Sequence, residues 1–429
     1  MAQTIFALSS GAPPAGVAVI RISGPDASDA LLSIAGTLPE SRRATLRTLR
    51  NPADGCELDS GLVLWMPAPA SATGEDCAEL HLHGGRAVVA AVESALGQVS
   101  GLRRAEPGEF TRRAFANGRI DLAEAEGLAD LLAAETELQR QTALAMAGGA
   151  LSRQVDHWRD CVLGLSAAIE ATLDFSDEGE VGEDLPTGFS DGCAELAGEI
   201  GAWLARPRVE PLREGLRVVL AGPPNTGKST LFNALIEREA AITAPEAGTT
   251  RDVLASSVAL DGLPFVFIDT AGLRVGDVGG VESIGIGRAK AEADRADLVL
   301  WLGEEGQGAN LERLWEISAQ ADRADQPAKL DPRHRISAVS GEGMADLRRD
   351  LIAFARSALP RPGDAALNAR QHNLLEEVHG SIKSLTSLID PILCAEGLRA
   401  ARAGLDRLIG RTGVEDMLDA LFGRFCIGK

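Results

Sequence analysis

The sequence has few cysteines, and none of them lie close together. Six cysteines are scattered over 429 residues, and no two are spaced as Cys-x-x-Cys. A disulfide framework and a zinc site both need clustered or regularly spaced cysteines. The sequence therefore favours neither a disulfide-rich protein nor a zinc protein.

Long apolar runs are also missing. No uncharged apolar stretch reaches the roughly 18 to 20 residues that a transmembrane helix needs. Residues 1–6 contain no basic segment ahead of an apolar one, so the sequence predicts no secretory signal. We therefore expect a cytoplasmic protein with no membrane association.

Positive charge is scarce. The chain has 42 lysines and arginines against 62 aspartates and glutamates, a net charge of −20. This excess disfavours indiscriminate binding to nucleic acid, so an RNA partner would need a local basic surface. The length and the hydrophobic content of 45% predict a globular protein of roughly three domains.

The first part of the chain, residues 1–118, predicts an α+β domain. Apolar strands are expected at 17–22 and 61–65, separated by glycine- and proline-containing turns. Helices are expected at 26–35 and 85–96. His81 and His83 alternate on a probable strand, where strand-end packing or hydrogen bonding is favoured over a metal site because no third ligand is evident.

Alanine- and glutamate-rich sequence follows and predicts a helical domain in two segments, 119–214 and 361–429. A helical run is expected from about 119 to 147, a second over 151–175 and a third near 190–205. Between the segments, residues 215–360 alternate strand and helix, with strands at 216–221, 265–268 and 297–302. This order predicts a parallel sheet with helices on both faces, an α/β domain inserted into the helical one.

A phosphate-binding loop stands at the start of the inserted domain. Gly222-Pro-Pro-Asn-Thr-Gly-Lys-Ser229 matches the pattern G-x-x-x-x-G-K-[ST] between a predicted strand and helix. Lys228 should contact the β- and γ-phosphates, and Ser229 should bind Mg²⁺. The alternative, an ordinary glycine turn, does not account for the flanking elements.

Three further motifs favour GTP. Gly248-Thr-Thr-Arg-Asp252 suits a switch I in which Thr250 reaches Mg²⁺, and Asp269-Thr-Ala-Gly272 suits switch II. Ser337-Ala-Val-Ser340 suits the loop beside a guanine base. The nucleotide-binding residues predicted from these motifs and from the altered guanine-reading motif are Asn225, Thr226, Gly227, Lys228, Ser229, Thr230, Thr249, Thr250, Asp269, Thr270, Ala271, Gly272, Asp322, Ser337 and Ala338.

The guanine-reading N-K-x-D motif is altered. Its best candidate is Ala319-Gln-Ala-Asp322, where Asp322 can still accept hydrogen bonds from guanine, and Asp322-Arg-Ala-Asp325 is second. Leu273, which follows switch II, cannot orient water as a glutamine does. Glu282 is the candidate for that task, and a solvated carboxylate at a helix start is the alternative.

Four separated blocks resemble one family, the tRNA-modification GTPases of the MnmE (TrmE) type. The GTPase motifs form one block. The other three are Gly74-Glu-Asp-Cys-Ala-Glu-Leu-His-Leu-His-Gly-Gly85, Pro107-Gly-Glu-Phe-Thr-Arg-Arg-Ala-Phe-Ala-Asn-Gly-Arg-Ile-Asp-Leu-Ala-Glu-Ala-Glu126 and Phe425-Cys-Ile-Gly-Lys429. The resemblance implies a homodimer that modifies C5 of the wobble uridine of certain tRNAs. Its implied partner is the flavin- and NADH-dependent protein MnmG (GidA).

The resemblance also assigns site residues. The N-terminal domain should bind 5-formyl- or methylene-tetrahydrofolate through Arg21, Glu79, Arg119 and Lys429, with Arg119 standing where a lysine is common. A potassium ion in the GTP site should be bound by Asn225, Ala244, Glu246 and Thr249. Glu282 falls on the catalytic glutamate, with Lys228 beside the phosphates.

Alternative interpretations stay open for the role of Cys426 and for the function of the whole chain. Cys426 alone would be taken for a buried structural cysteine, whereas the resemblance places it near the folate as a redox or nucleophilic residue. For the whole chain, the alternative function is a regulatory GTPase switch that docks on ribosomal RNA or a membrane without modification chemistry. Such a switch would not need the folate-like domain or the terminal Cys-Ile-Gly-Lys.

Overall fold

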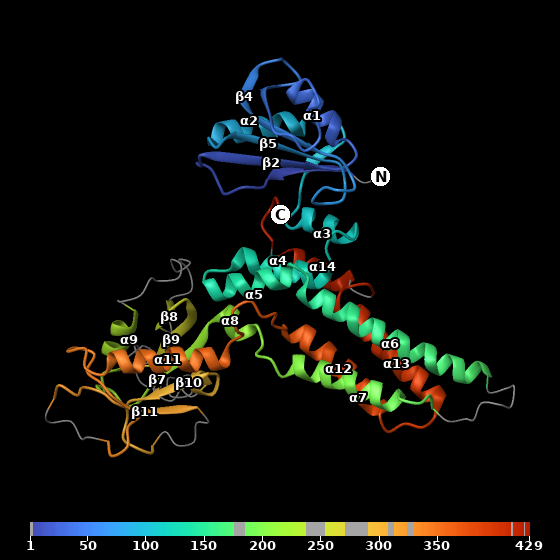
Figure 1. Cartoon of the computed structure of the whole chain (residues 1–429). Coiled ribbons are helices and arrows are strands. Elements are labelled where there is room, and N and C mark those ends of the chain that lie inside the picture. The colour runs from blue at the N-terminus through green and yellow to red at the C-terminus, as the bar shows by residue number, and fades with distance from the viewer. Residues whose placement is uncertain are drawn as a thin grey trace, which may run out of the picture. The chain divides into compact units, whose positions relative to one another are not determined.

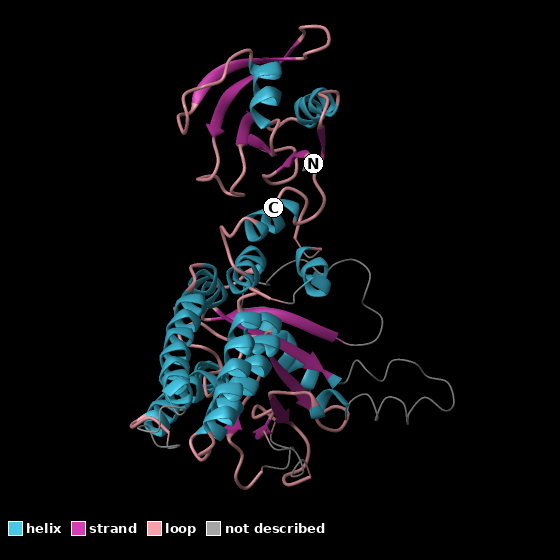
Figure 2. Ribbon diagram, turned by 90° about the vertical axis from the view of Figure 1, so that its right-hand side faces the viewer, coloured by secondary structure: helices cyan, strands magenta, loops and turns pink. Residues whose placement is uncertain are grey.

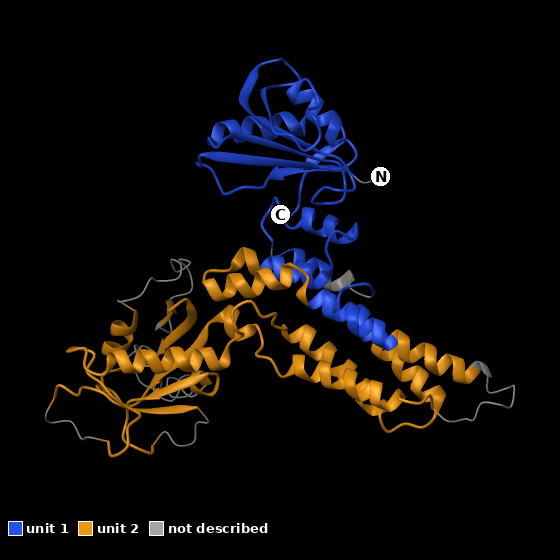
Figure 3. Cartoon of the chain, in the orientation of Figure 1, with its two compact units in different colours: residues 1–129, 151–162, 402–429 blue, residues 130–150, 163–401 orange. Residues whose placement is uncertain are grey.

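The computed structural model describes residues 3–175, 185–236, 254–270, 291–307, 313–323, 329–412, 415–423 and 425–429. It falls into two compact units, shown in Figure 3. Unit 1 comprises Met1–Ala129, Leu151–Val162 and Arg402–Lys429, and unit 2 comprises Asp130–Ala150 and Leu163–Ala401. None of the helices among the described residues has the length and apolar character needed to cross a bilayer.

Unit 1 is built around a sheet, whose strands are magenta in Figure 2. Its strand order is β3-β4-β5-β2-β1-β6. Neighbouring strands are antiparallel except β1 and β6, which are parallel. The predicted strands at 17–22 and 61–65 are confirmed as β2 and part of β4. The six strands are β1 (Thr4–Leu8), β2 (Val17–Ser23), β3 (Thr45–Arg50), β4 (Glu57–Met66), β5 (Cys77–His83) and β6 (Leu102–Arg104).

Helices cover this sheet because its strands alternate buried and exposed side chains. Ile20 of β2 and Leu80 of β5 pack with Leu31 of α1 (Ala27–Ala35) and Val92 of α2 (Arg86–Gly97) in one buried core. Alternate residues of β1 pack instead with Phe110 of α3 (Glu109–Ala116) in a smaller cluster. These elements confirm the predicted α+β domain and its two helices.

The helical run expected from about 119 to 147 is in fact two helices. The first helix, α4 (Leu122–Ala133), ends at Ala133, and the second, α5 (Glu137–Ala147), begins directly after Thr136. The side chains of Thr136 and Gln139 exchange hydrogen bonds with each other's backbone N–H groups, a capping box that starts a new helix. The prediction of an unbroken run was therefore wrong, although Thr-x-x-Gln is a recognisable start signal.

Unit 2 contains the predicted α/β sheet, with the order β12-β11-β10-β7-β9-β8. The strands are parallel except β8, which is antiparallel to β9 and which the sequence analysis did not assign. Asp261 and Gly262 join these two strands with φ of 52° and 76°. The Asp-Gly pair is a hairpin signal, so this strand was detectable. The strands are β7 (Leu216–Ala221), β8 (Leu254–Leu260), β9 (Leu263–Asp269), β10 (Leu298–Trp301), β11 (Leu314–Ser318) and β12 (His334–Arg335).

The hydrophobic core of the α/β domain also contains side chains from helices that precede residue 215 in the chain. Leu138 of α5 and Leu212 of α8 (Glu210–Glu214) are buried in the same cluster as Leu216 of β7 and Leu351 of α11 (Met344–Ala358). Gln139 of α5 donates a hydrogen bond to the carbonyl of Leu212 over 2.8 Å. The inserted domain is thus joined to α5 by packing as well as by the chain.

Long helices make up the rest. In unit 2, α7 (Phe189–Leu204) and α12 (Ala369–Leu385) lie side by side (Figure 1). The predicted helices at 151–175 and 190–205 are confirmed by α6 and α7. The remaining helices are α6 (Ala150–Phe175), α9 (Lys228–Ile236), α13 (Pro391–Leu408) and α14 (Glu415–Phe422).

Candidate functional site

The phosphate loop connects β7 to α9. Gly222 begins it with φ of 145°, and a Cβ there would lie 2.9 Å from the backbone nitrogen of Gly303, so a side chain would not fit. The Lys228 ammonium donates to the carbonyls of Gly222 and Pro223 over 2.9 and 2.6 Å. The lysine is buried within the loop, where its charge is available to an anionic ligand.

Ser229 and Asp269 meet beside this loop. The Ser229 hydroxyl donates to Oδ2 of Asp269 over 2.6 Å. The parallel pairing of β7 with β9 sets Leu220 opposite Asp269, which brings the end of β9 to the phosphate loop. Thr270 then bonds the carbonyl of Leu220 over 2.8 Å. A hydroxyl and a buried carboxylate at one point are hard oxygen ligands and fit Mg²⁺.

Asp322 lines a cavity that Gly227 of the phosphate loop also lines. The hydroxyl of buried Ser337 bonds the Asp322 carboxylate and holds its pKa below the usual range, so this side chain remains an anion and an acceptor. Ser337 in turn accepts from the backbone N–H of Ser340 over 3.1 Å. The cavity is lined by Gly227, Thr230, Leu231, Ala319, Gln320, Asp322, Arg323, Ile336, Ala338 and Val339.

The structure brings together those residues of the predicted nucleotide site that it describes. Asn225 and Thr226 lie in the loop, and Thr226 bonds the Pro223 carbonyl over 2.9 Å. The other predicted residues lie outside the described residues, together with Leu273 and Asp325. They are Ala244, Glu246, Thr249, Thr250, Ala271, Gly272 and Glu282.

In unit 1, two of the residues predicted for the folate site contact each other. Arg21 of β2 faces Glu79 of β5, and their side chains form an ion pair with an N–O distance of 3.0 Å. His81 approaches the other oxygen of Glu79 at 3.2 Å, and His83 lies 2.7 Å from Asp59. Each histidine is thus within hydrogen-bonding distance of a carboxylate, in agreement with the hydrogen-bonding role that the sequence analysis favoured over a metal site.

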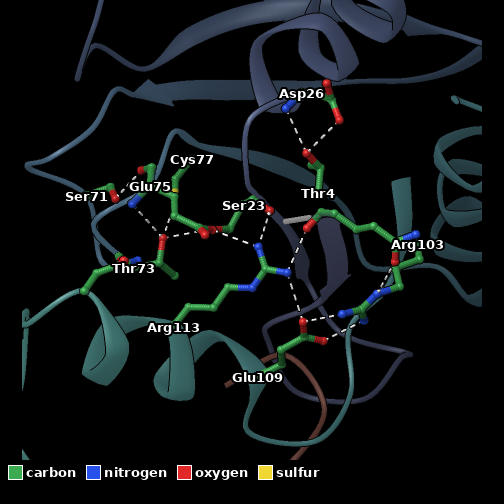
Figure 4. A network of polar contacts seen from close by, with 12 residues as sticks. Thr4, Ser23, Asp26, Ser71, Thr73, Glu75, Cys77, Arg103, Glu109 and Arg113 are labelled. Carbon is green, nitrogen blue, oxygen red and sulfur yellow. Dashed lines mark hydrogen bonds and ion pairs between the residues drawn. The ribbon is translucent and has the colours of Figure 1, made fainter. Parts of the chain in front are cut away.

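The network in Figure 4 fixes the loop beside Arg119. Arg113 of α3 bonds Glu75 over 2.9 Å and Glu109 over 3.0 Å, and it also donates to backbone carbonyls. Asn117 donates to the carbonyl of Thr73 over 2.7 Å. A Cβ on Gly74 would lie 3.2 Å from Cγ of Arg119, so this loop packs directly on that side chain. The sequence analysis did not predict the pairing of Arg113 with Glu75, because no local sequence motif indicates it.

The last residues of the chain are seated against β1. Pro107 and Ile427 form a β-bridge, and the Ser9 hydroxyl donates to the carbonyl of Gly428 over 2.7 Å. Gly428 has φ of 97°, and a Cβ there would lie 1.9 Å from the carbonyl oxygen of Leu8. Cys426 is exposed, so the interpretation of it as a buried structural cysteine was wrong.

Comparison with known proteins identifies the family. Residues 4–119 match the GTP-binding protein TrmE N-terminus, and residues 122–426 match the MnmE helical domain. The "tRNA modification GTPase MnmE" of Novosphingobium aromaticivorans is 65% identical over 100% of both chains. The chain belongs to the MnmE family of tRNA modification GTPases.

Other MnmE relatives agree over similar lengths. The MnmE of Erythrobacter litoralis is 61% identical, and that of Zymomonas mobilis is 49% identical, each over 100% of both chains. Among solved structures, the G domain of the T. maritima FeoB iron transporter aligns at 24% identity, covering 33% of this chain and 98% of that one, with a TM-score of 0.25. That score is too low to support an inference.

Proposed function

We propose that this protein hydrolyses GTP to drive modification of C5 of the wobble uridine of certain tRNAs. The main support is the geometry of the phosphate loop, where the Ser229 hydroxyl donates to Asp269 and the ammonium of Lys228 is buried. The membership of the chain in the MnmE family is the second support. A bound nucleotide replaces the loop carbonyls as the partner of Lys228, because phosphate oxygens are the stronger acceptors. The lysine then neutralises charge on the β- and γ-phosphates.

The metal sites follow from the same residues. The Ser229 hydroxyl and Thr250 would hold Mg²⁺, with the carboxylate of Asp269 bonded to Ser229 beside it. Asn225, Ala244, Glu246 and Thr249 would hold K⁺, which would supply positive charge beside the phosphates as an arginine does in other GTPases. Glu282 orients the attacking water, because Leu273 has no polar group with which to do so.

The one-carbon donor is a 5-formyl- or methylene-tetrahydrofolate in the N-terminal domain. Arg21 and Arg119 are cations suited to the carboxylates of a folate, and Glu79 is held in place by Arg21 and His81. Lys429 and Cys426 lie in the tail that is seated against β1. The exposed thiol of Cys426 serves as the redox or nucleophilic group.

The working assembly is a homodimer with the flavin- and NADH-dependent protein MnmG (GidA) and a tRNA substrate. Arg103 pairs with Glu109 and Arg399 pairs with Glu396, so we do not propose either side chain as a contact for the tRNA. The alternative of a regulatory switch on ribosomal RNA or a membrane does not account for the seated tail.

Mass spectrometry of tRNA nucleosides tests this function. A strain lacking the gene should lose a C5-modified uridine, and the intact chain should restore it, whereas Lys228→Ala should not. An unchanged nucleoside profile in the deletion strain would favour the regulatory switch.

Potassium is tested separately by GTP turnover in KCl and in NaCl at equal ionic strength. Turnover should be far faster in KCl, and equal rates would remove K⁺ from the mechanism. Glu282→Ala should lower kcat on the order of 10²-fold with little change in nucleotide affinity, since a water-positioning group acts in the transition state.

A further inference from the structure

A cavity lies where the end of α4, the helix α5 and the short helix α8 meet. Its volume is about 160 Å³. The lining is mostly apolar and includes Ala133 of α4, Ala143 and Met146 of α5, Leu212 of α8 and Val209 just before α8. An apolar cavity of about 150 Å³ is large enough to bind benzene. The space therefore fits one small ring.

The hydroxyl of Thr142, on α5, has no hydrogen-bond partner among the described residues. Thr142 lines the cavity and is only 1% exposed. A threonine inside a helix can bond the carbonyl oxygen three or four residues before it, yet this hydroxyl bonds no carbonyl of the described chain. A buried hydroxyl without a partner is costly, and native structures usually satisfy it. A molecule bound in the cavity can supply the missing partner.

The two charged side chains of the lining neutralise each other. The guanidinium of Arg213 donates to Oδ2 of Asp130 over 2.6 Å. The amide nitrogen of Gln139 donates to the carbonyl of Leu212 over 2.8 Å. A charged molecule would lose its hydration in this cavity without meeting an unbalanced opposite charge. The lining therefore favours a neutral molecule.

We propose that this cavity is a binding site for a small neutral molecule that carries one apolar ring and one hydroxyl group. The ring occupies the space beside Ala143, Met146 and Leu212, and the hydroxyl bonds that of Thr142. None of the lining residues belongs to the predicted nucleotide or folate sites, so binding here does not depend on either site. Leu212 is also part of the core of the α/β domain, so the bound molecule adds to the packing between α5 and that domain.

The test is a fluorine NMR titration of the full chain with 4-fluorophenol and with fluorobenzene, two probes that differ by one hydroxyl. Thr142→Val keeps the shape of the side chain but removes its hydroxyl. It should weaken the binding of 4-fluorophenol about fivefold, the usual effect of losing one hydrogen bond. The affinity for fluorobenzene should stay within about twofold. An equal change for both probes, or no change for 4-fluorophenol, would overturn the proposal.

A second pair of variants tests the position of the site. Ala143→Phe places a ring in the cavity and should abolish saturable binding of both probes. Ala147→Phe makes the same change one turn further along α5, outside the lining, and should leave both affinities within about twofold. Binding that persists in Ala143→Phe, or no saturable binding to the unsubstituted chain, would also overturn the proposal. Fluorobenzene binding by Thr142→Val reports an intact cavity, so the first comparison holds even where Ala143→Phe fails to fold.

Discussion

The hydroxyl of Ser229 and the carboxylate of Asp269 are 2.6 Å apart, although 40 residues separate them in the chain. Asp269 ends β9 and is buried, whereas Ser229 lies in the first turn of α9 and is exposed. The pair therefore lies where the end of β9 meets the phosphate loop.

Removing the charge of Asp269 should weaken metal-dependent binding. For Asp269→Asn, we expect GTP affinity in Mg²⁺ to fall at least tenfold and turnover to fall with it, because an outer-shell carboxylate stabilises the ion and its ligands. Affinity measured in excess chelator should change little. Asp261→Asn is the control, since it makes the same change in the β8–β9 turn, at the opposite end of β9. Equal losses with and without Mg²⁺ would assign Asp269 a purely structural role.

Asp322 should carry most of the discrimination between bases. Its carboxylate is held ionised by Ser337, so Asp322→Asn removes a charge-assisted acceptor worth about 1.5 to 3 kcal/mol and should weaken GTP binding at least tenfold. Ser337→Ala should cause a smaller loss by freeing the same carboxylate. Titration calorimetry measures both. Normal binding by Asp322→Asn together with weak binding by Asp325→Asn would show that the second register is the true one.

Seating of the C-terminal tail depends on Gly428. In Gly428→Ala the new Cβ would collide with the Leu8 carbonyl, so we expect the tail to leave its seat and tRNA modification to fall at least tenfold. Basal GTP turnover should be unaffected, because the nucleotide site lies in unit 2. Gly11→Ala is the control, since a Cβ there meets nothing within 4 Å. Full modification activity in Gly428→Ala would mean that the tail position is not needed for the chemistry.

Thiol reactivity should separate Cys426 from Cys193. Burial, with a contribution from Cys394, raises the pKa of the Cys193 thiol to about 11, so only about a thousandth of it is thiolate at pH 8. Iodoacetamide at pH 8 should label exposed Cys426 and leave Cys193 unmodified until the protein unfolds. Peptide mass spectrometry gives the extent at each site, with Cys426→Ser as the control. Rapid labelling of Cys193 in the folded chain would contradict its burial.

Local signals predicted much of this fold. The phosphate loop, the strands at 216–221 and 265–268 and the helices expected at 26–35 and 85–96 were found because each follows from a short, regular pattern. Strand β8 and the break before α5 were missed although Asp261-Gly262 and Thr136-Glu-Leu-Gln139 carry recognised signals for both. Both signals are only two to four residues long. At Thr136 the helical periodicity of the surrounding sequence outweighed the capping signal.

Other features had no local signal at all. The bond from Gln320 to Asn225 joins two loops 95 residues apart, and the pairing of Arg113 with Glu75 spans 38 residues. Such contacts depend on which strands are neighbours in a sheet, and a single sequence does not give strand order. The exposure of Cys426 likewise depends on how the tail packs against β1.

The burial of Leu138 has a practical consequence for dissecting this protein. A fragment cut at residues 215 and 360 would lack both Leu138 and Leu212, and the apolar core surface that these two side chains cover would be exposed to water. Such a fragment would melt earlier and bind nucleotide less tightly than the same residues do in the intact chain. GTP turnover rates measured on this fragment would therefore be lower than those of the intact protein. A fragment that keeps the native core would have to include α8 and replace the first turn of α5.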